Sequence, residues 1–189
     1  MAGQTSKLRL VPASGAELSD DELMERARRG YPGAFDALVT RHQARMLRVA
    51  ARLMGDQTSA ADAVQNAFVE LFCALDRYQA CGKLKSYLYR LLLNQCRHSW
   101  RRERSALRFL MSIASHAEPR KVPAPNGFDL DVERSLAKLP EQQRAAVLLH
   151  YAGGLTQQEI ADALEIPVGT VKSRIFEAMG RIRQSMEVP

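Results

Sequence analysis

Residues 156–174, TQQEIADALEIPVGTVKSR, have the pattern of a helix-turn-helix and decide the fold of the C-terminal part of the chain. Thr156 and Glu159 stand at the spacing of a capping box, which predicts a helix beginning at Gln157. Residues 165–167, Glu-Ile-Pro, are predicted to form the tight turn before the next helix. The small side chain of Ala161 leaves room for that helix to cross closely. A second helix held in this way suits the major groove of DNA.

The second helix, predicted over residues 168–186, has a buried side and an outer face suited to a groove. An apolar stripe recurs at spacings of four, three and four residues, through Val171, Ile175, Ala178 and Ile182. The residues expected to face outward are Gly169, Ser173, Phe176, Glu177 and Gly180, with Lys172 and Arg174 on the flanks. Small outer residues permit a close approach to base edges, and flanking cations can contact phosphates. An ordinary amphipathic helical hairpin is the alternative. The helix-cap signals and the turn at residues 165–167 favour the DNA-binding interpretation.

The rest of the chain also predicts helices. Aromatic residues make up only 6% of the chain, and Ala, Leu, Arg, Gln and Glu recur throughout, as is typical of helical proteins. Apolar spacing and turn residues predict helices over about residues 20–30, 34–54, 59–75, 86–104, 130–138, 141–152, 157–164 and 168–186. We expect an all-α protein of two small helical domains joined by a flexible linker. The expected segments are a flexible tail (1–18), a first domain (19–104), the linker (105–129) and a helix-turn-helix domain (130–189), with residues 107–113 as a possible extension of the fourth helix.

Positive charge is concentrated in one segment. Between Lys83 and Arg108 there are eight basic residues and a single acid, Glu103, whereas the whole chain has a formal net charge of +6. Such a segment suits a polyanionic partner. A solvated helix face carries similar runs of cations, so charge alone leaves both interpretations open.

Other classes of protein find little support. No apolar run approaches the roughly 20 residues that span a bilayer, and the first residues lack a secretory signal, so we expect a cytoplasmic protein. The three cysteines form no Cys-x-x-Cys pair, and the four histidines are scattered. We therefore expect no catalytic residue, no metal, no cofactor and no small-molecule substrate. A metal sensor built on Cys73, Cys81, Cys96 and His98 is the remaining alternative of this kind.

Motifs in both domains resemble those of the extracytoplasmic-function (ECF) sigma factors, the small two-domain branch of bacterial RNA polymerase sigma subunits. In the second domain the resemblance rests on LPEQQR (139–144), EIA (159–161) and PVGTVKSR (167–174). In the first it rests on residues 30–35, on DAVQNAF (62–68) and on SYLYR (86–90) followed by Asn94. The resemblance covers about residues 19–183.

The resemblance implies an alternative sigma factor, not an enzyme, that binds core RNA polymerase and directs promoter-specific initiation. It implies that the first domain recognises and melts the −10 element and captures a single strand, through Lys83, Lys85, Tyr87, Arg90, Asn94 and Arg97. It implies that the helix-turn-helix domain binds the duplex −35 element, through Thr170, Lys172, Ser173, Arg174, Phe176, Glu177 and Arg181. The implied contacts with core polymerase are Asp62, Gln65, Asn66, Phe68, Val69 and Phe72. An anti-sigma partner and a monomeric free state are also implied, with the linker threading near the active-site channel of the polymerase.

Some positions depart from the family pattern. Asn66 stands where an acid is usual, Tyr87 replaces a Trp, and Glu177 and Met179 occupy positions often taken by Arg. The main competing interpretation is a stand-alone transcriptional regulator, because LuxR-type domains share the Glu-Ile-Ala and Thr-Val-Lys patterns. Those domains usually continue with a residue and then His, where this chain has Ser173 and Arg174. A regulator of that type would also leave the basic segment unexplained.

Overall fold

The computed structural model describes residues 18–113 and 130–186, and every regular element within them is helical. The expected tail, apart from Leu18, and residues 114–129 of the expected linker lie outside the described residues. No helix in the described ranges is long and apolar enough to cross a membrane.

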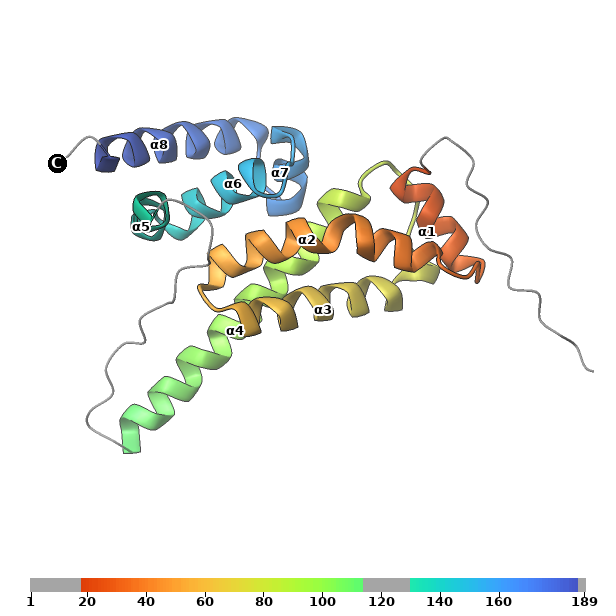
Figure 1. Ribbon diagram of the computed structural model, residues 1–189, viewed down its shortest axis with the longest axis horizontal. Coiled ribbons are helices and arrows are strands. Elements are labelled where there is room, and N and C mark those ends of the chain that lie inside the picture. Colours follow the sequence, from red (N-terminus) through yellow and green to blue (C-terminus); the bar gives the residue numbers. More distant parts are fainter. Residues whose placement is uncertain (1–17, 114–129, 187–189) are drawn as a thin grey trace, which may run out of the picture.

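The first domain is a bundle of three long helices with a short helix packed at its N-terminal end. Its helices are α1 (Asp20–Arg28), α2 (Ala34–Met54), α3 (Gln57–Cys73), the 3-10 turn η1 (Leu75–Arg77) and α4 (Leu84–Ile113). α3 packs against both α2 and α4, and α1 packs on α2 (Figure 1). A capping box begins α1, since the Ser19 hydroxyl accepts from the Glu22 N–H (3.3 Å) while the Ser19 N–H donates to the Glu22 carboxylate (2.8 Å).

Two predicted boundaries in this domain were wrong. α3 begins at Gln57 rather than near Ser59, because the Asp56 carboxylate accepts from the Ser59 N–H (2.8 Å) and caps the helix earlier. α4 begins at Leu84, so that Lys85 lies in the helix rather than in the preceding loop. α4 also continues to Ile113, which is the extension left open by the sequence, and the connection to the second domain starts later than residue 105.

The second domain has the four helices predicted from the sequence. They are α5 (Leu130–Lys138), α6 (Glu141–Tyr151), α7 (Gln157–Leu164) and α8 (Val168–Met186). Thr156 and Glu159 form the predicted capping box at the start of α7. α7 is followed by Glu165, which caps it in a left-handed conformation (φ 56°) that is uncommon for residues other than Gly or Asn.

The two domains pack directly against each other. Residues of α4 contact α7, and residues of α2 contact α6, so that the hydrophobic core continues from one domain into the other (Figure 1). Tyr89 and Leu93 of α4 are buried there. α4 is therefore covered on two sides, by α3 and by the helix-turn-helix domain.

Candidate nucleic-acid and polymerase interfaces

The outer face of α8 presents the residues expected to contact duplex DNA. Val171, Ile175 and Ala178 are buried against the domain, which turns the opposite side of the helix to solvent. Phe176 is 83% exposed, more than any other large hydrophobic side chain in the described ranges. The other exposed members of the set are Lys172, Ser173, Glu177 and Arg181, whereas Thr170 and Arg174 are half-buried.

Two glutamines of α6 hold side chains of this face, and the sequence pattern did not reveal them. Arg174 donates to the amide oxygen of Gln142 (2.6 Å), and Gln143 donates to the carboxylate of Glu177 (2.7 Å). The Ser173 hydroxyl donates to the Gly169 carbonyl (3.1 Å) and keeps its lone pairs as acceptors. The arrangement gives Arg174 and Glu177 fixed positions, so their reach toward DNA is set partly by α6.

An aromatic and cationic surface lies at the beginning of α4. The rings of Tyr78 and Tyr87 have centroids 6.1 Å apart, and the Arg90 guanidinium lies 5.1 Å from the centre of the Tyr87 ring. Tyr87, Arg90, Asn94 and Arg97 follow one another at spacings of three, four and three, which places them along one side of the helix. Arg97 donates to the side-chain oxygen of Asn94 (3.2 Å). Both rings are half-buried, and such rings beside guanidinium groups are suited to stacking unpaired bases.

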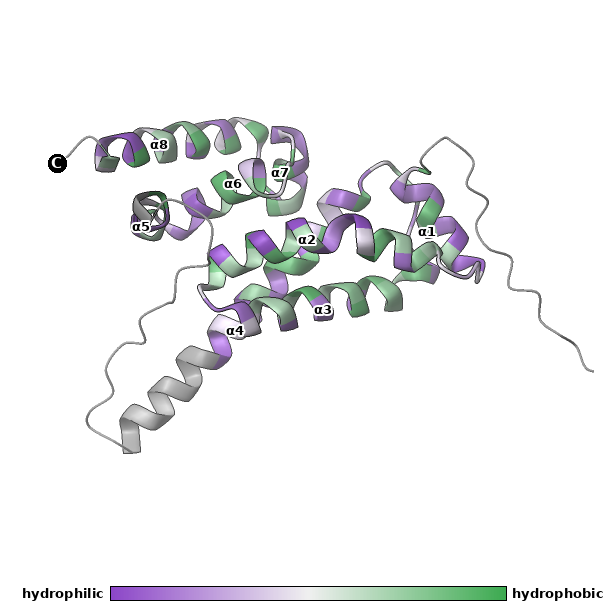
Figure 2. Cartoon of the chain, in the orientation of Figure 1, coloured by the Kyte–Doolittle hydropathy of each residue, from purple (hydrophilic) through white to green (hydrophobic). Residues whose placement is uncertain are grey.

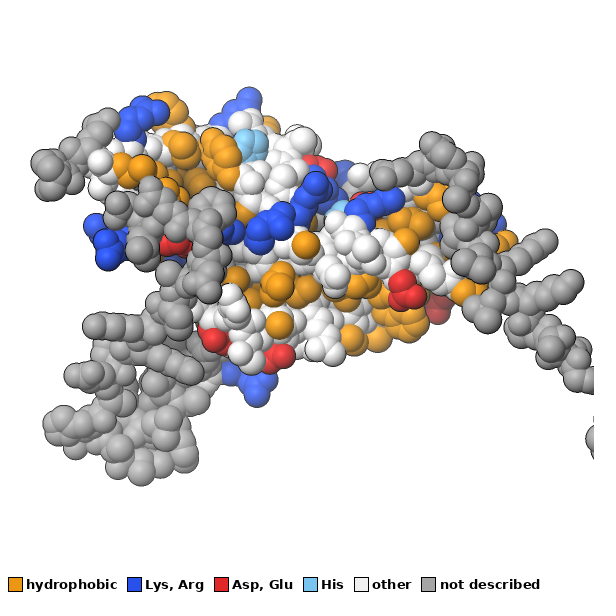
Figure 3. Space-filling model, in the orientation of Figure 1, with side chains coloured by type: hydrophobic (Ala, Val, Ile, Leu, Met, Phe, Trp, Pro, Cys, Tyr) orange, Lys and Arg blue, Asp and Glu red, His pale blue; other side chains and the backbone are white. Residues whose placement is uncertain are grey.

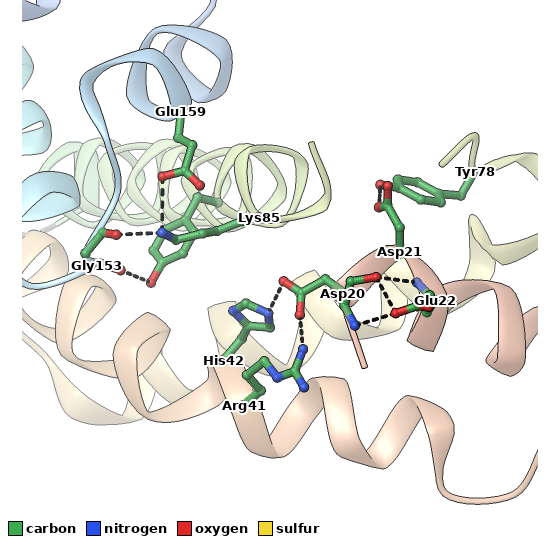
Figure 4. Close-up of polar contacts among 12 residues, drawn as sticks. Asp20, Asp21, Glu22, Arg41, His42, Tyr78, Lys85, Gly153 and Glu159 are labelled. Atoms are coloured by element: carbon green, nitrogen blue, oxygen red, sulfur yellow. Dashed lines mark hydrogen bonds and ion pairs between the residues drawn. The ribbon is translucent and has the colours of Figure 1, made fainter. Parts of the chain in front are cut away.

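The loop before α4 is tied to the first turn of α1. The Asp21 carboxylate accepts from the Tyr78 hydroxyl (2.7 Å) and from the Gly82 N–H (2.6 Å), across 57 and 61 residues of sequence. Burial, together with the Asp21 carboxylate, raises the pKa of Tyr78 far above its ordinary value, so the hydroxyl stays protonated and donates. The neighbouring Asp20 faces α2 instead and accepts from Arg41 (2.6 Å) and His42 (2.8 Å), as Figure 4 shows. One helical turn thereby positions both α2 and the loop.

Three cations expected to bind the −10 strand are paired with the helix-turn-helix domain. Lys83 lies 3.3 Å from Asp162, Lys85 lies 3.1 Å from Glu159, and Arg90 lies 2.7 Å from Glu165 (nitrogen to oxygen). Lys85 also donates to the carbonyl of Gly154 (2.5 Å), and Figure 4 shows its side chain directed toward Glu159. Arg97, the remaining cation of the predicted set, is exposed and donates to Asn94 of its own helix.

The pKa of Glu159 reflects this pairing. Burial acts to raise it, but the Thr156 N–H and the Lys85 ammonium together outweigh burial and leave the pKa below its ordinary value. Glu159 therefore serves two purposes, because the same carboxylate caps α7 and pairs with α4.

An apolar groove runs between α2 and α3 beside the residues expected to contact polymerase. It has a volume of 670 Å³ and includes Phe35, Leu47, Val64, Val69 and Phe72 in its walls. Val69 and Phe72 are more than half exposed, at 55% and 57%, and much of α3 is hydrophobic (Figure 2). The space-filling view shows hydrophobic side chains gathered over α2 and α3 (Figure 3).

Of the polar members of the predicted polymerase set, Gln65 lines this groove, whereas Asp62 and Asn66 line a separate hollow between α3 and α4. Asp62, Gln65 and Asn66 are exposed on α3. Phe68 is only 7% exposed, with its ring edge-on to that of Phe35, so it lines the floor of the groove and belongs to the core. Phe68 as a polymerase contact stays a prediction, and a partner would reach its ring at the floor of the groove.

Nothing in the described ranges supports the metal-sensor alternative. No group of three His, Cys, Asp or Glu side chains there is arranged to hold a metal ion. Cys73 and Cys81 are exposed, whereas Cys96 is buried in the core, and burial raises the pKa of its thiol to about 12.

Comparison with known families and proteins agrees with the two-domain division. The family model for Sigma-70 region 2 matches residues 38–106, and that for Sigma-70, region 4 matches residues 129–182. The ECF RNA polymerase sigma-E factor of Escherichia coli (strain K12) is 31% identical over 186 residues, covering 90% of this chain and 96% of the relative. The RNA polymerase sigma-H factor of Pseudomonas aeruginosa is 30% identical over 181 residues, covering 89% of this chain and 94% of the relative.

Two solved structures share the fold over most of the chain. CnrH in complex with the cytosolic domain of CnrY has a TM-score of 0.67 and 27% identity, covering 89% of this chain and 97% of that one. The sigma factor RpoE of Bartonella quintana, in complex with the anti-sigma factor NepR, has a TM-score of 0.67 and 25% identity, covering 82% and 98%.

Proposed function

The chain belongs to the extracytoplasmic-function sigma factors, alternative sigma factors that direct promoter-specific transcription initiation, and from this premise we propose how its surfaces divide that task. Initiation needs three contacts: with core RNA polymerase, with the −35 duplex and with the opened −10 element. Three separate surfaces of the chain suit these contacts.

The −35 duplex is bound by the outer face of α8. Lys172 and Arg181 are exposed at the edges of this face and reach phosphates, while Ser173 and Phe176 approach base edges. Arg174 and Glu177 are hydrogen-bonded to Gln142 and Gln143 of α6, respectively, so each makes fewer contacts with DNA than an unrestrained side chain would. Because α8 has few basic side chains available for phosphates, the isolated second domain binds duplex DNA weakly. Polymerase contributes most of the binding free energy at the promoter.

The opened −10 strand is captured by the beginning of α4 and the loop before it. The observation that carries this assignment is the grouping of Tyr87, Arg90 and Asn94 on one side of α4, next to the ring of Tyr78. A flipped base costs a few kcal/mol to unstack, and ring faces, an amide and guanidinium groups recover that cost. Asp21 holds the loop in place for this purpose.

Core polymerase is bound at the apolar groove between α2 and α3. Val69 and Phe72 provide apolar contact area, Gln65 provides a polar side chain at the groove, and Asp62 and Asn66 extend the polar surface of α3 toward α4. This composition, an apolar centre with polar surroundings, is that of a protein–protein interface. The protein acts in the cytoplasm, where bacterial core polymerase works.

An anti-sigma factor also binds this chain. Support comes from two solved relatives, one in complex with the anti-sigma factor NepR and the other with the cytosolic domain of CnrY. The chain covers 97% and 98% of these relatives, so nearly every segment of them has a counterpart here.

Replacing Asn94 with Ala tests the −10 assignment. With core polymerase and a promoter transcribed by this factor, the variant should form closed complexes about as well as the unchanged protein and open complexes at least tenfold less well. Permanganate reactivity of unpaired thymines measures opening, and a filter-binding assay at low temperature measures the closed complex. His98→Ala, an exposed position one turn further along α4, is the control. Equal loss of both complexes would contradict the assignment.

A further inference from the structure

Two adjacent glutamines at the start of α6 bind oppositely charged side chains of α8, the helix assigned to the −35 duplex. Arg174 and Glu177 are three residues apart on α8, a spacing at which opposite charges commonly pair. Here each is bound by a neutral amide instead, because Gln142 accepts from Arg174 (2.6 Å) and Gln143 donates to Glu177 (2.7 Å). Neither charge depends on the other for a partner, so the Glu177 carboxylate can serve a ligand that arrives from outside.

The Gln143 side chain is committed to this one contact. It is only 8% exposed, and its bond to Glu177 is the one side-chain hydrogen bond that it makes among the described residues. Its amide oxygen, Oε1, is buried there without a partner, which costs stability. Turning the amide over would place that oxygen against the Glu177 carboxylate, so the NH2 group stays directed at Glu177. The contact with Glu177, rather than the packing of the domain, therefore accounts for a glutamine at this position.

Glu177 keeps one carboxylate oxygen for a donor outside the domain. The bond from Gln143 is accepted by Oε2, the side chain is exposed, and Oε1 has no hydrogen-bond partner within the part of the chain that the structure describes. Ser173, one turn earlier on the same face, donates its proton to the Gly169 carbonyl (3.1 Å) and so presents acceptors as well. This part of the −35 face therefore suits a base that presents a donor in the major groove.

The base that best fits a fixed carboxylate is cytosine. Cytosine presents its N4 amino group to the major groove, whereas guanine presents acceptors at N7 and O6, and thymine presents an acceptor at O4 beside a methyl group. Adenine also presents an amino group, but the N7 acceptor beside it repels a carboxylate. Because an ionised Glu177 offers only acceptors, it discriminates against every base except cytosine.

We propose that Glu177 recognises a cytosine of the −35 element and that Gln143 is the positioning residue for that contact. The proposal rests on the assignment of α8 to the −35 duplex and names the base that one residue of this helix selects. Gln143 does not touch DNA. Its hydrogen bond restricts the rotamers of Glu177 before DNA arrives, so less conformational entropy is lost when the base is bound.

The test uses the full-length protein with core RNA polymerase and a promoter that the pair transcribes. Each base pair of the −35 element is replaced in turn by the other three, and the affinity of the polymerase complex for each template gives the preference at that position. The variants are Glu177→Gln and Gln143→Met, since Met has nearly the shape of Gln but no donor. Gln95→Met is the matched control, because Gln95 of α4 likewise donates to a carboxylate of a neighbouring helix, that of Glu70 (2.9 Å), but in the first domain.

We expect the unchanged protein to prefer cytosine by about tenfold at one −35 position, on either strand, and Glu177→Gln to lose that preference. In this variant Gln143 still donates to the side-chain oxygen at position 177, so the new amide turns its NH2 group to the groove and favours a base that presents an acceptor.

Gln143→Met should reduce the cytosine preference by about threefold at the same position and at no other. Its midpoint in urea denaturation should not fall, because the buried oxygen without a partner is removed. Gln95→Met should change the preference at no −35 position.

A cytosine preference that Glu177→Gln leaves intact, or the absence of any such preference in the unchanged protein, would overturn the assignment of Glu177. If Gln143→Met lowered the urea midpoint and weakened binding equally for all −35 sequences, Gln143 would be a structural residue and its positioning role would be overturned. Promoter-specific initiation by the unchanged protein is measured on the same templates, so failure of this proposal and failure of the proposed function are distinguishable.

Discussion

The Tyr89 hydroxyl of α4 donates a hydrogen bond to the carbonyl oxygen of Gly153, 3.3 Å away and in the other domain. Burial raises the pKa of Tyr89 to about 12, so the hydroxyl keeps its proton and donates throughout the physiological range. There is no room for a side chain at Gly153, since a Cβ would lie 2.7 Å from the Leu149 carbonyl and 3.2 Å from the Tyr89 ring. The two residues therefore form a close contact between the domains, and its loss has a measurable cost.

Replacing Tyr89 with Phe should lower the free energy of unfolding by about 1 kcal/mol, because the hydrogen bond is lost and the Gly153 carbonyl remains buried. Urea denaturation followed by circular dichroism measures the change. Tyr151→Phe is the matched control, since that ring is 63% exposed. Indistinguishable midpoints for the two variants would show that the Tyr89 hydrogen bond does not stabilise the packed arrangement.

Removing the carboxylate of Asp21 should release the loop that precedes α4. With Asp21→Ala, the Gly82 amide loses its acceptor, and its hydrogen exchange should accelerate by at least tenfold. Promoter opening should fall as well, because Tyr78 loses its anchor. Glu25→Ala, which removes a carboxylate from the same helix, should leave the exchange rate of Gly82 unchanged. An unaltered rate in Asp21→Ala would mean that other contacts hold the loop.

Replacing Lys172 with Ala should weaken binding to all promoters and reduce the salt dependence of binding. One phosphate contact contributes about 0.9 to the slope of log affinity against log salt concentration, so the slope should fall by about one. Binding of the polymerase complex to a promoter fragment, measured at several salt concentrations, gives the slope. Lys138→Ala, an exposed cation of the same domain outside α8, should leave it unchanged. A slope that Lys172→Ala does not alter would exclude a phosphate contact at this residue.

Replacing Phe72 with Ser should weaken binding to core polymerase by about tenfold, because burying a large apolar side chain contributes about 1.5–3 kcal/mol and this ring is only partly buried beforehand. Fluorescence anisotropy of labelled sigma factor with core enzyme, in the absence of DNA, measures the affinity. Tyr31→Ser, at another exposed aromatic residue, serves as the control. If both variants bind core enzyme as the unchanged protein does, the groove between α2 and α3 is not the docking surface.

The elements that the sequence predicted well are those whose signals are local. α5, α7 and α8 begin and end at the predicted residues, since capping boxes, Pro167 and helical spacing all lie within a few positions of each boundary. α3 was placed two residues late because Asp56, rather than Ser59, supplies the capping oxygen. The family resemblance was likewise readable from short motifs.

The relationships that the sequence did not predict join residues far apart along the chain. Asp21 and Gly82 are 61 residues apart, and Lys85 and Glu159 are 74 apart, so no spacing rule connects them. Tyr89 stands between Leu88 and Arg90 in the sequence, and its burial depends on a second domain that covers α4. Two domains on a flexible linker were expected, and their packing against each other follows from surface complementarity that only the folded chain displays.

The most direct measurement of the central claim is transcription in vitro with purified core RNA polymerase and this protein, using promoter templates identified by sequencing the transcripts that the pair produces. The account predicts promoter-specific initiation that depends on the added protein and is lost when either the −10 or the −35 element is changed. The contradicting result is an absence of specific initiation at every promoter, together with tight binding of the protein alone to duplex DNA, as a stand-alone regulator would show.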